Sequence, residues 1–146
     1  MAQLLLIMHS KNRKMRTVIL ALIFTTIAYI SFGQTSVKRE DTFGDKIAYI
    51  EGNTVYREDR FGEKLFYKKG QTIKREDTFG DKVFFIKGNT VYEEDTFGAK
   101  LYFFKNNTIY NQDTFGDKLY YIDGNTIRRK DKFGKKLYFF DKTPEI

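Results

Sequence analysis

An 18-residue unit that occurs six times constrains this chain more than any other feature. Each copy begins with the motif Asp-x-Phe-Gly-x-Lys, and the six motifs start at Asp41, Asp59, Asp77, Asp95, Asp113 and Asp131. A fixed period of this length indicates stacked copies of one supersecondary unit, none of which can bury its apolar side chains alone. The chain is therefore predicted to be a repeat protein, and positions are numbered one to eighteen from the Asp of each copy.

Both ends of the unit carry residues that favour turns. Positions twelve to fourteen read Gly-Asn-Thr, Gly-Gln-Thr or Asn-Asn-Thr, and positions one and four are always Asp and Gly. Gly and Asn tolerate the positive φ of short hairpin turns, and Asp can accept a hydrogen bond from the backbone two residues on. Between the turns lie two segments rich in β-branched and aromatic residues, at positions six to ten and fourteen to eighteen. Each repeat is therefore predicted to form one β-hairpin.

Two arrangements of such hairpins compete. A β-solenoid would stack the six Lys residues of position six directly above one another, about 4.8 Å apart, where like charges repel. An up-and-down meander separates equivalent residues by two strands, so we favour an all-β meander and keep the solenoid as the alternative. A sheet of about twelve strands is expected to curl. Unless it closes, the strands around Val37 and Leu137 would have unpaired edges.

Alternation along the strands predicts which side chains form the core. We expect the core to contain Phe at position three, the aliphatic residue at seven, the aromatic at nine and Val or Ile at fifteen. This leaves a row of rings at position eight on the less buried face, bordered by Lys at position six. Such a row could stack on sugars or on a partner's apolar groups, although the curled sheet could instead cover the rings itself. The candidate ligand-binding residues are Phe66, Phe84, Tyr102, Tyr120, Tyr138, Lys64, Lys82, Lys100 and Lys118.

Residues 1–33 are typical of a secretory signal peptide. A basic cluster precedes the uncharged run 17–30, which matches a signal-peptide apolar region and is short for a membrane span. Small residues at Ser31 and Gly33 predict cleavage after Gly33, leaving 34–146 as a single β-repeat domain with no stable membrane span. A start at Met15 would give a shorter leader. The predicted location is secreted, periplasmic or on the cell surface, and the alternative is a membrane anchor formed by an uncleaved leader.

Charge and composition exclude several function classes. Four of the 26 basic residues precede residue 33, which leaves 22 basic against 19 acidic residues in 34–146 and argues against nucleic-acid binding. The domain has neither Cys nor His, the commonest nucleophiles, bases and transition-metal ligands. Asp at positions one and five suggests calcium, but position five becomes Ala99 and Lys135. We therefore expect no enzymatic activity, cofactor or metal.

The pattern Asp-x-x-Gly, a basic residue, Leu, aromatic residues and then Gly-Asn-Thr, as in Asp113 to Thr126, resembles the YD repeats of bacterial Rhs-type surface and toxin-shell proteins. The Tyr that precedes Asp in that family is absent, because Glu, Gln or Lys occupies the place, and the basic residue comes one position later. The resemblance covers most of 34–146. It implies exported β-hairpin architecture, and no encapsulating shell.

These observations predict an exported, non-catalytic β-repeat protein that acts as a structural or binding module at the bacterial cell envelope or outside the cell. One alternative is a glycan-binding repeat that uses surface aromatics. A second is an accessory or inhibitory subunit of an enzyme. The partner is undetermined, with a polysaccharide or another envelope protein as the candidates.

Overall fold

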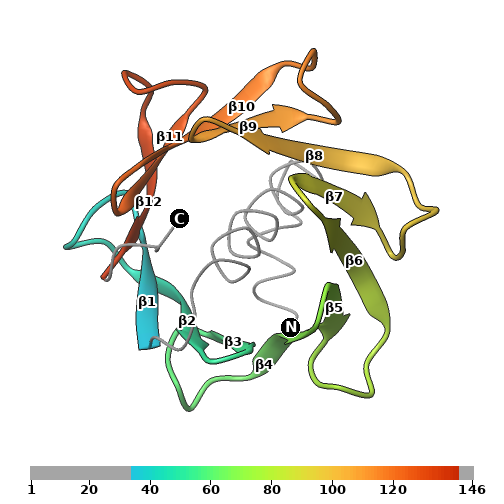
Figure 1. The fold of residues 1–146 in the computed structure, drawn as a ribbon. Helices are drawn as coiled ribbons and strands as arrows, with labels where there is room; N and C mark the ends of the chain where they lie inside the picture. The colour runs from blue at the N-terminus through green and yellow to red at the C-terminus, as the bar shows by residue number, and fades with distance from the viewer. Residues whose placement is uncertain (1–33, 142–146) are drawn as a thin grey trace, which may run out of the picture.

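The computed structural model describes residues 34–141, so the predictions for the leader, its cleavage and Met15 lie outside the described residues. This part of the chain is all-β, as predicted (Figure 1). Its twelve strands are β1 (Gln34–Arg39), β2 (Lys46–Glu51), β3 (Thr54–Arg57), β4 (Lys64–Lys69), β5 (Thr72–Arg75), β6 (Lys82–Lys87), β7 (Thr90–Glu93), β8 (Lys100–Lys105), β9 (Thr108–Asn111), β10 (Lys118–Asp123), β11 (Thr126–Arg129) and β12 (Lys136–Phe140). None of the described residues forms a helix that could cross a membrane.

The strands form an up-and-down antiparallel meander that closes on itself. Each strand pairs with the next along the chain, and β1 pairs with β12. The meander is therefore confirmed over the solenoid, and the expected curl of the sheet goes as far as a barrel. The strands expected to have unpaired edges pair with each other, with Val37 opposite Phe140 and Arg39 opposite Tyr138. The Lys38 ammonium and the Asp141 carboxylate, 2.9 Å apart, add an ion pair at this seam.

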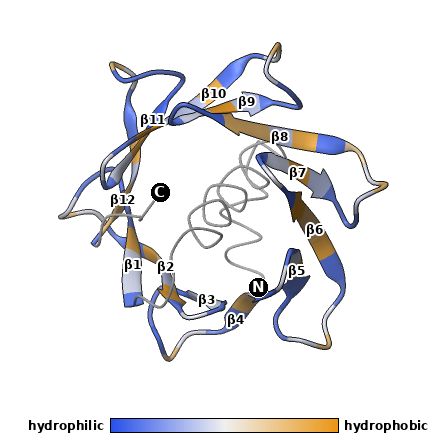
Figure 2. Cartoon of the chain, in the orientation of Figure 1, coloured by the Kyte–Doolittle hydropathy of each residue, from blue (hydrophilic) through white to orange (hydrophobic). Residues whose placement is uncertain are grey.

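The buried face of the sheet carries positions eight, ten and fifteen. Val55 lies opposite Ile50 on one neighbouring strand and opposite Phe66 on the other, and directly opposed residues share a face. Figure 2 shows hydrophobic residues mainly along the longer strands, such as β6 and β8, and mostly hydrophilic turns with hydrophobic positions at the outer tips. The buried apolar residues are Val37, Ala48, Ile50, Val55, Leu65, Phe66, Ile73, Phe84, Val91, Tyr102, Ile109, Ile122, Ile127 and Phe140.

The predicted core is right at position fifteen and wrong at position three. All five residues at position fifteen are buried, whereas the six Phe side chains at position three are 84% to 95% exposed. The residues at position nine are half-buried in all six copies. Those at position seven are also half-buried, except Leu65, which is buried. Alternation correctly separates the two faces of each strand, but only the register between strands shows that position fifteen shares its face with eight and ten.

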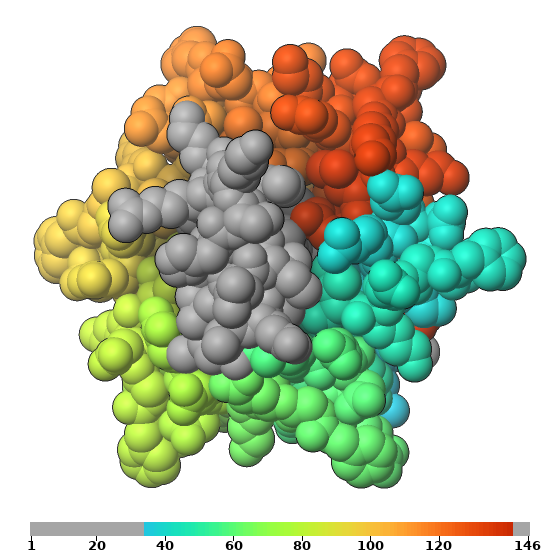
Figure 3. All heavy atoms as spheres, turned by 180° about the vertical axis from the view of Figure 1, so that it is seen from behind, coloured from blue at the N-terminus to red at the C-terminus, as the bar shows by residue number. Residues whose placement is uncertain are grey.

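The two kinds of turn lie at opposite ends of the barrel. Neighbouring strands run in opposite directions, so all six Asp-x-Phe-Gly turns share one end, which we call the Phe rim (41–45, 59–63, 77–81, 95–99, 113–117 and 131–135). Five two-residue turns form the other end, the Gly rim (52–53, 70–71, 88–89, 106–107 and 124–125). The first residue of β1 and the last of β12 also lie at the Gly rim. Figure 3 shows lobes around the perimeter that follow one another in chain order.

Candidate interaction surface

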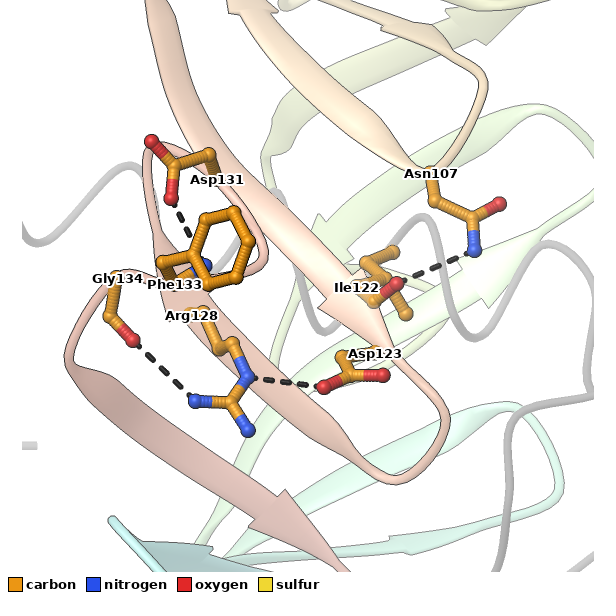
Figure 4. A network of polar contacts seen from close by, with 7 residues as sticks. All are labelled: Asn107, Ile122, Asp123, Arg128, Asp131, Phe133 and Gly134. Carbon is orange, nitrogen blue, oxygen red and sulfur yellow. Dashed lines mark hydrogen bonds and ion pairs between the residues drawn. The ribbon is translucent and has the colours of Figure 1, made fainter.

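Every turn of the Phe rim has the same hydrogen bonds. The Asp Oδ1 at position one accepts the backbone N–H of Phe at position three, with N to O distances of 2.8 to 2.9 Å in all six copies. The Asp carbonyl accepts the N–H of Gly at position four, at 3.0 Å in the turn of Asp95. This is an Asx-turn inside a β-turn, the arrangement that Asp favours. Figure 4 shows the last copy, with Asp131, Phe133 and Gly134.

Gly at position four is required by space. A Cβ atom at Gly98 would lie 1.7 Å from the carbonyl oxygen of Glu93, and the other five copies have the same clash with the residue at position seventeen. Real Cβ atoms do not approach backbone that closely, so any other residue would open the turn.

In the last copy, the Arg128 side chain also holds the turn through hydrogen bonds. Its Nε donates to the Asp123 carboxylate at 2.9 Å and its NH1 donates to the Gly134 carbonyl at 3.4 Å (Figure 4).

The Phe side chains of the rim contribute nothing to the described core. Their exposed fractions are 94%, 84%, 93%, 94%, 95% and 85% in chain order. The two lowest values belong to Phe61 and Phe133, where the preceding residue is basic. The Arg60 guanidinium lies 4.7 Å from the ring centre of Phe61, and the Lys132 ammonium lies 5.0 Å from that of Phe133. The other four turns have Thr before Phe and leave the ring uncovered.

The Phe rim, taken together with the Lys residue that follows each turn, carries nearly balanced charge. Positions one to six of the six copies contain nine basic and ten acidic residues, a net charge of −1. All six Lys residues at position six are exposed. Two ion pairs involve acidic residues of this end: Arg57 with Glu63 at 2.8 Å, and Lys135 with Glu40 at 3.0 Å. The Phe rings therefore lie among charged residues of both signs, because the Lys residues of position six offset the acidic residues of the turns.

The candidate rings of position eight do not line an exposed row. Phe66, Phe84 and Tyr102 are only 8%, 4% and 7% exposed, and Tyr120 and Tyr138 pack half-buried against the core. The expectation that position eight lies on the less buried face is therefore wrong. Burial raises the pKa of the Tyr120 hydroxyl, with Arg129 opposing, and raises the pKa of Tyr138 further, with Tyr120 adding to the rise and Arg39 opposing it.

The candidate Lys residues lie elsewhere. Lys64, Lys82, Lys100 and Lys118 are exposed at the first position of β4, β6, β8 and β10, where the Phe-rim turns end. The structure therefore exposes these Lys residues where the Phe-rim turns end, whereas the rings of position eight are buried or half-buried. Sequence reasoning assigned the Phe residues of position three to the core. Their exposure could have been predicted from their position inside a tight Asp-x-x-Gly turn, because such a turn has no room to fold a ring back onto the sheet.

The half-exposed face of the sheet carries a second set of rings, at positions nine and sixteen. Tyr49 lies opposite Tyr56, with ring centres 6.4 Å apart and planes tilted by 48°. Phe85 lies opposite Tyr92 and Phe103 opposite Tyr110 in the same register. This face, rather than that of position eight, therefore presents half-buried aromatics to solvent.

No group of three or more His, Cys, Asp or Glu residues within 34–141 is placed to hold a metal ion.

No family model, curated protein or solved structure matches this chain.

Proposed function

We propose that the protein is an exported, non-catalytic binding module that acts at the bacterial cell envelope or outside the cell, and that the Phe rim is its interaction surface. One observation carries the proposal: six Phe residues in six identical turns stand at the same end of the barrel, each at least 84% exposed. Exposed apolar groups gathered at one place on a soluble protein are typical of interaction sites.

The turn itself does not explain these rings. Asp is needed for its carboxylate and Gly for its missing Cβ, but Phe contributes only a backbone N–H to the turn. Ser or Thr at position three would supply the same N–H and improve solubility. A large apolar side chain in all six copies, exposed in each within the described residues, is therefore best explained by contact with a partner.

A capture experiment tests the proposal. The full chain is compared with a quadruple variant, Phe43→Ser, Phe79→Ser, Phe97→Ser and Phe115→Ser, for co-sedimentation with bacterial cell-envelope fractions. We expect the variant to lose most of its binding while its melting temperature stays within about 8 °C of that of the unsubstituted chain, because four exposed substitutions, each worth at most about 0.5 kcal/mol, change the free energy of unfolding by at most about 2 kcal/mol. The matched control changes the neighbouring Thr42, Thr78, Thr96 and Thr114 to Ser. Equal capture of all three proteins would refute the proposed surface.

Glycan binding is the second candidate, now through the aromatics of positions nine and sixteen. The opposed, half-buried pair Tyr49 and Tyr56 favours it, because rings partly open to solvent can stack on sugar faces. Retention on insoluble polysaccharides should fall in a Tyr49→Ala, Tyr56→Ala variant and stay unchanged in the quadruple Phe variant. If no polysaccharide retains the chain, this candidate is dismissed and the Phe rim is unaffected.

A further inference from the structure

We infer that the Phe rim binds the lipid–water interface of a bilayer, with its rings inserted among the lipid headgroups and upper acyl chains. The inference rests on the proposed function and names the partner of the same surface. Three properties of the rim lead to it: the arrangement of the rings, their separation and the charge around them.

The rings are arranged to meet a flat surface. The six turns are equivalent elements of a closed sheet, so their Phe residues lie at similar heights around the barrel axis. The Asx-turn and β-turn hydrogen bonds hold each backbone in the same conformation, which limits the entropy lost on binding. Gln34 begins β1 and Phe140 ends β12 at the opposite rim, so the chain enters and leaves the barrel away from the rings. Within residues 34–141, the ends of the chain therefore leave the six turns open to a flat partner.

The rings are also separate from one another. Equivalent residues of neighbouring repeats are two strands apart, roughly 10 Å or more, and polar residues of the turns lie between them. A protein partner would need six apolar pockets at matching positions. A lipid interface needs none, because isolated aromatic side chains partition into it individually. Separate, fully exposed rings therefore favour lipid over a folded protein surface.

The charge next to each ring suits insertion. Position two, at the tip beside Phe, is Thr in four copies and basic in two, and it is never acidic. The Asp carboxylate at position one is bound to the turn backbone. Arg60 and Lys132 can remain at the level of lipid phosphates while their neighbouring rings enter the bilayer. Position five is acidic in four copies, but Lys at position six follows each turn, so positions one to six together have a net charge of only −1. The rings should therefore drive binding, and zwitterionic lipid should suffice.

Single-tryptophan probes test the inference. The chain contains no Trp, so one substitution supplies an unambiguous fluorescence signal. Phe115→Trp is the Phe-rim probe, and Asn53→Trp, at an exposed turn of the opposite end, is the matched Gly-rim probe, both in the full chain. Phosphatidylcholine vesicles, plain or with brominated acyl chains, are added to each. We expect the emission of the Phe-rim probe to shift to the blue and to be quenched by bromine more strongly than that of the Gly-rim probe.

Vesicle co-sedimentation measures the contribution of the rings. Losing even part of the transfer free energy of a Phe ring should lower the partition coefficient by several-fold, so the quadruple Phe→Ser variant should bind at least about tenfold more weakly than the unsubstituted chain. Raising the salt from 0.1 M to 0.5 M should change the partition coefficient by less than about threefold, because screening acts on charges and not on rings.

Three outcomes would overturn the lipid inference. Quenching of the Gly-rim probe equal to or stronger than that of the Phe-rim probe would mean that another part of the chain meets the bilayer. An absence of quenching at either probe would mean that the barrel does not bind lipid. A blue shift of the Phe-rim probe that follows protein concentration without vesicles would identify a second copy of the chain as the occupant. If the Phe-rim probe is not quenched but the quadruple variant still loses capture by envelope fractions, only the lipid inference falls and the proposed surface stands.

Discussion

The two rims of the barrel are built from the same repeat, yet only the Phe rim has a side chain that the fold does not need. At the Gly rim, residues Gly52, Gly70, Gly88 and Gly124 supply φ near +60° for two-residue turns. The amide of Asn107 donates to the Ile122 carbonyl of the next repeat at 3.2 Å (Figure 4), and the amide of Asn125 donates to the Phe140 carbonyl at 3.0 Å. At the Phe rim, Asp and Gly have equally clear roles and Phe has none. Repetition alone therefore does not separate structural residues from functional ones.

Glycine also serves the two rims differently. A Cβ at Gly88 would meet nothing within 4 Å, so Gly is there for its positive φ alone, whereas at Gly98 the conformation is ordinary and the space is missing. The left-handed residues that directly precede the Phe-rim turns are not Gly: Glu40, Glu58, Glu76, Glu94, Gln112 and Lys130 all have φ between 57° and 64°. Substitutions at matched positions of the two rims test this difference.

The largest expected difference separates a Phe of the barrel wall from a Phe of the rim. Phe84→Ala should lower the free energy of unfolding by about 3 to 5 kcal/mol, because it leaves a cavity in the core. Phe79→Ala should change it by no more than about 0.5 kcal/mol, since the side chain is exposed. Urea denaturation monitored by tyrosine fluorescence measures both. Similar destabilisation by the two substitutions would mean that the rim rings are packed in solution.

The two kinds of glycine should respond to alanine by different amounts. Gly98→Ala should cost about 3 kcal/mol or more, because Cβ and the Glu93 carbonyl cannot both stay in place. Gly88→Ala should cost about 1 kcal/mol, the penalty of a left-handed conformation in open space. Thermal unfolding of both variants measures the difference. Equal losses would contradict the distinction between missing space and positive φ.

The barrel wall should lose stability at alkaline pH. The folded pKa of Tyr138 is raised above its ordinary value of 10.0 by burial, so the unfolded chain releases this proton first. The contribution of Tyr138 to the free energy of unfolding is therefore fully present below about pH 10 and declines at higher pH. Tyr138→Phe cannot ionise, so its melting temperature should fall less steeply between pH 9 and 11, while the two proteins keep a constant difference from pH 6 to 8. Parallel curves across the whole range would exclude this role of Tyr138.

The Asp carboxylate of the Phe rim should have a moderate effect. Asp95→Ala removes the acceptor of the Phe97 N–H and should lower the free energy of unfolding by about 1 kcal/mol. Asp95→Asn keeps an acceptor oxygen at the same place and should retain most of that stability. Chemical denaturation of the pair measures the difference. If Asn destabilised as much as Ala, the negative charge rather than the turn hydrogen bond would matter.

The smallest expected effect is a gain. Glu94 is left-handed at the Phe rim, with φ of 57°, and its N–H donates to the Val83 carbonyl at 2.9 Å. Glu94→Gly keeps that backbone donor and relieves the strain, so we expect a rise of about 0.5 kcal/mol after the greater entropy of the unfolded Gly chain is subtracted. The control, Glu93→Gly at the preceding strand residue, should destabilise. A loss in Glu94→Gly would show that the Glu side chain has a role of its own.

Much of the fold could be predicted because its signals are local. Gly-Asn pairs, Asp-x-x-Gly motifs and segments rich in β-branched and aromatic residues each act over a few residues, and they predict the hairpins and the meander correctly. The candidate site could not be predicted in the same way. Leu101 and Phe103 alternate with Tyr102 and Phe104, both faces of that strand are apolar, and nothing within the strand shows which face is buried.

The repeat, its turns and the antiparallel order of its strands follow from the sequence, because these depend on residues close together in the chain. Tertiary structure alone decided the burial of Phe84 and Tyr102, the exposure of the six rim Phe residues, and the pairing of β1 with β12. These features depend on register and closure, which bring together residues from different repeats. Closure also gathers turns spread over 90 residues of sequence, from Asp41 to Asp131, onto one rim, where six side chains can act as a single surface.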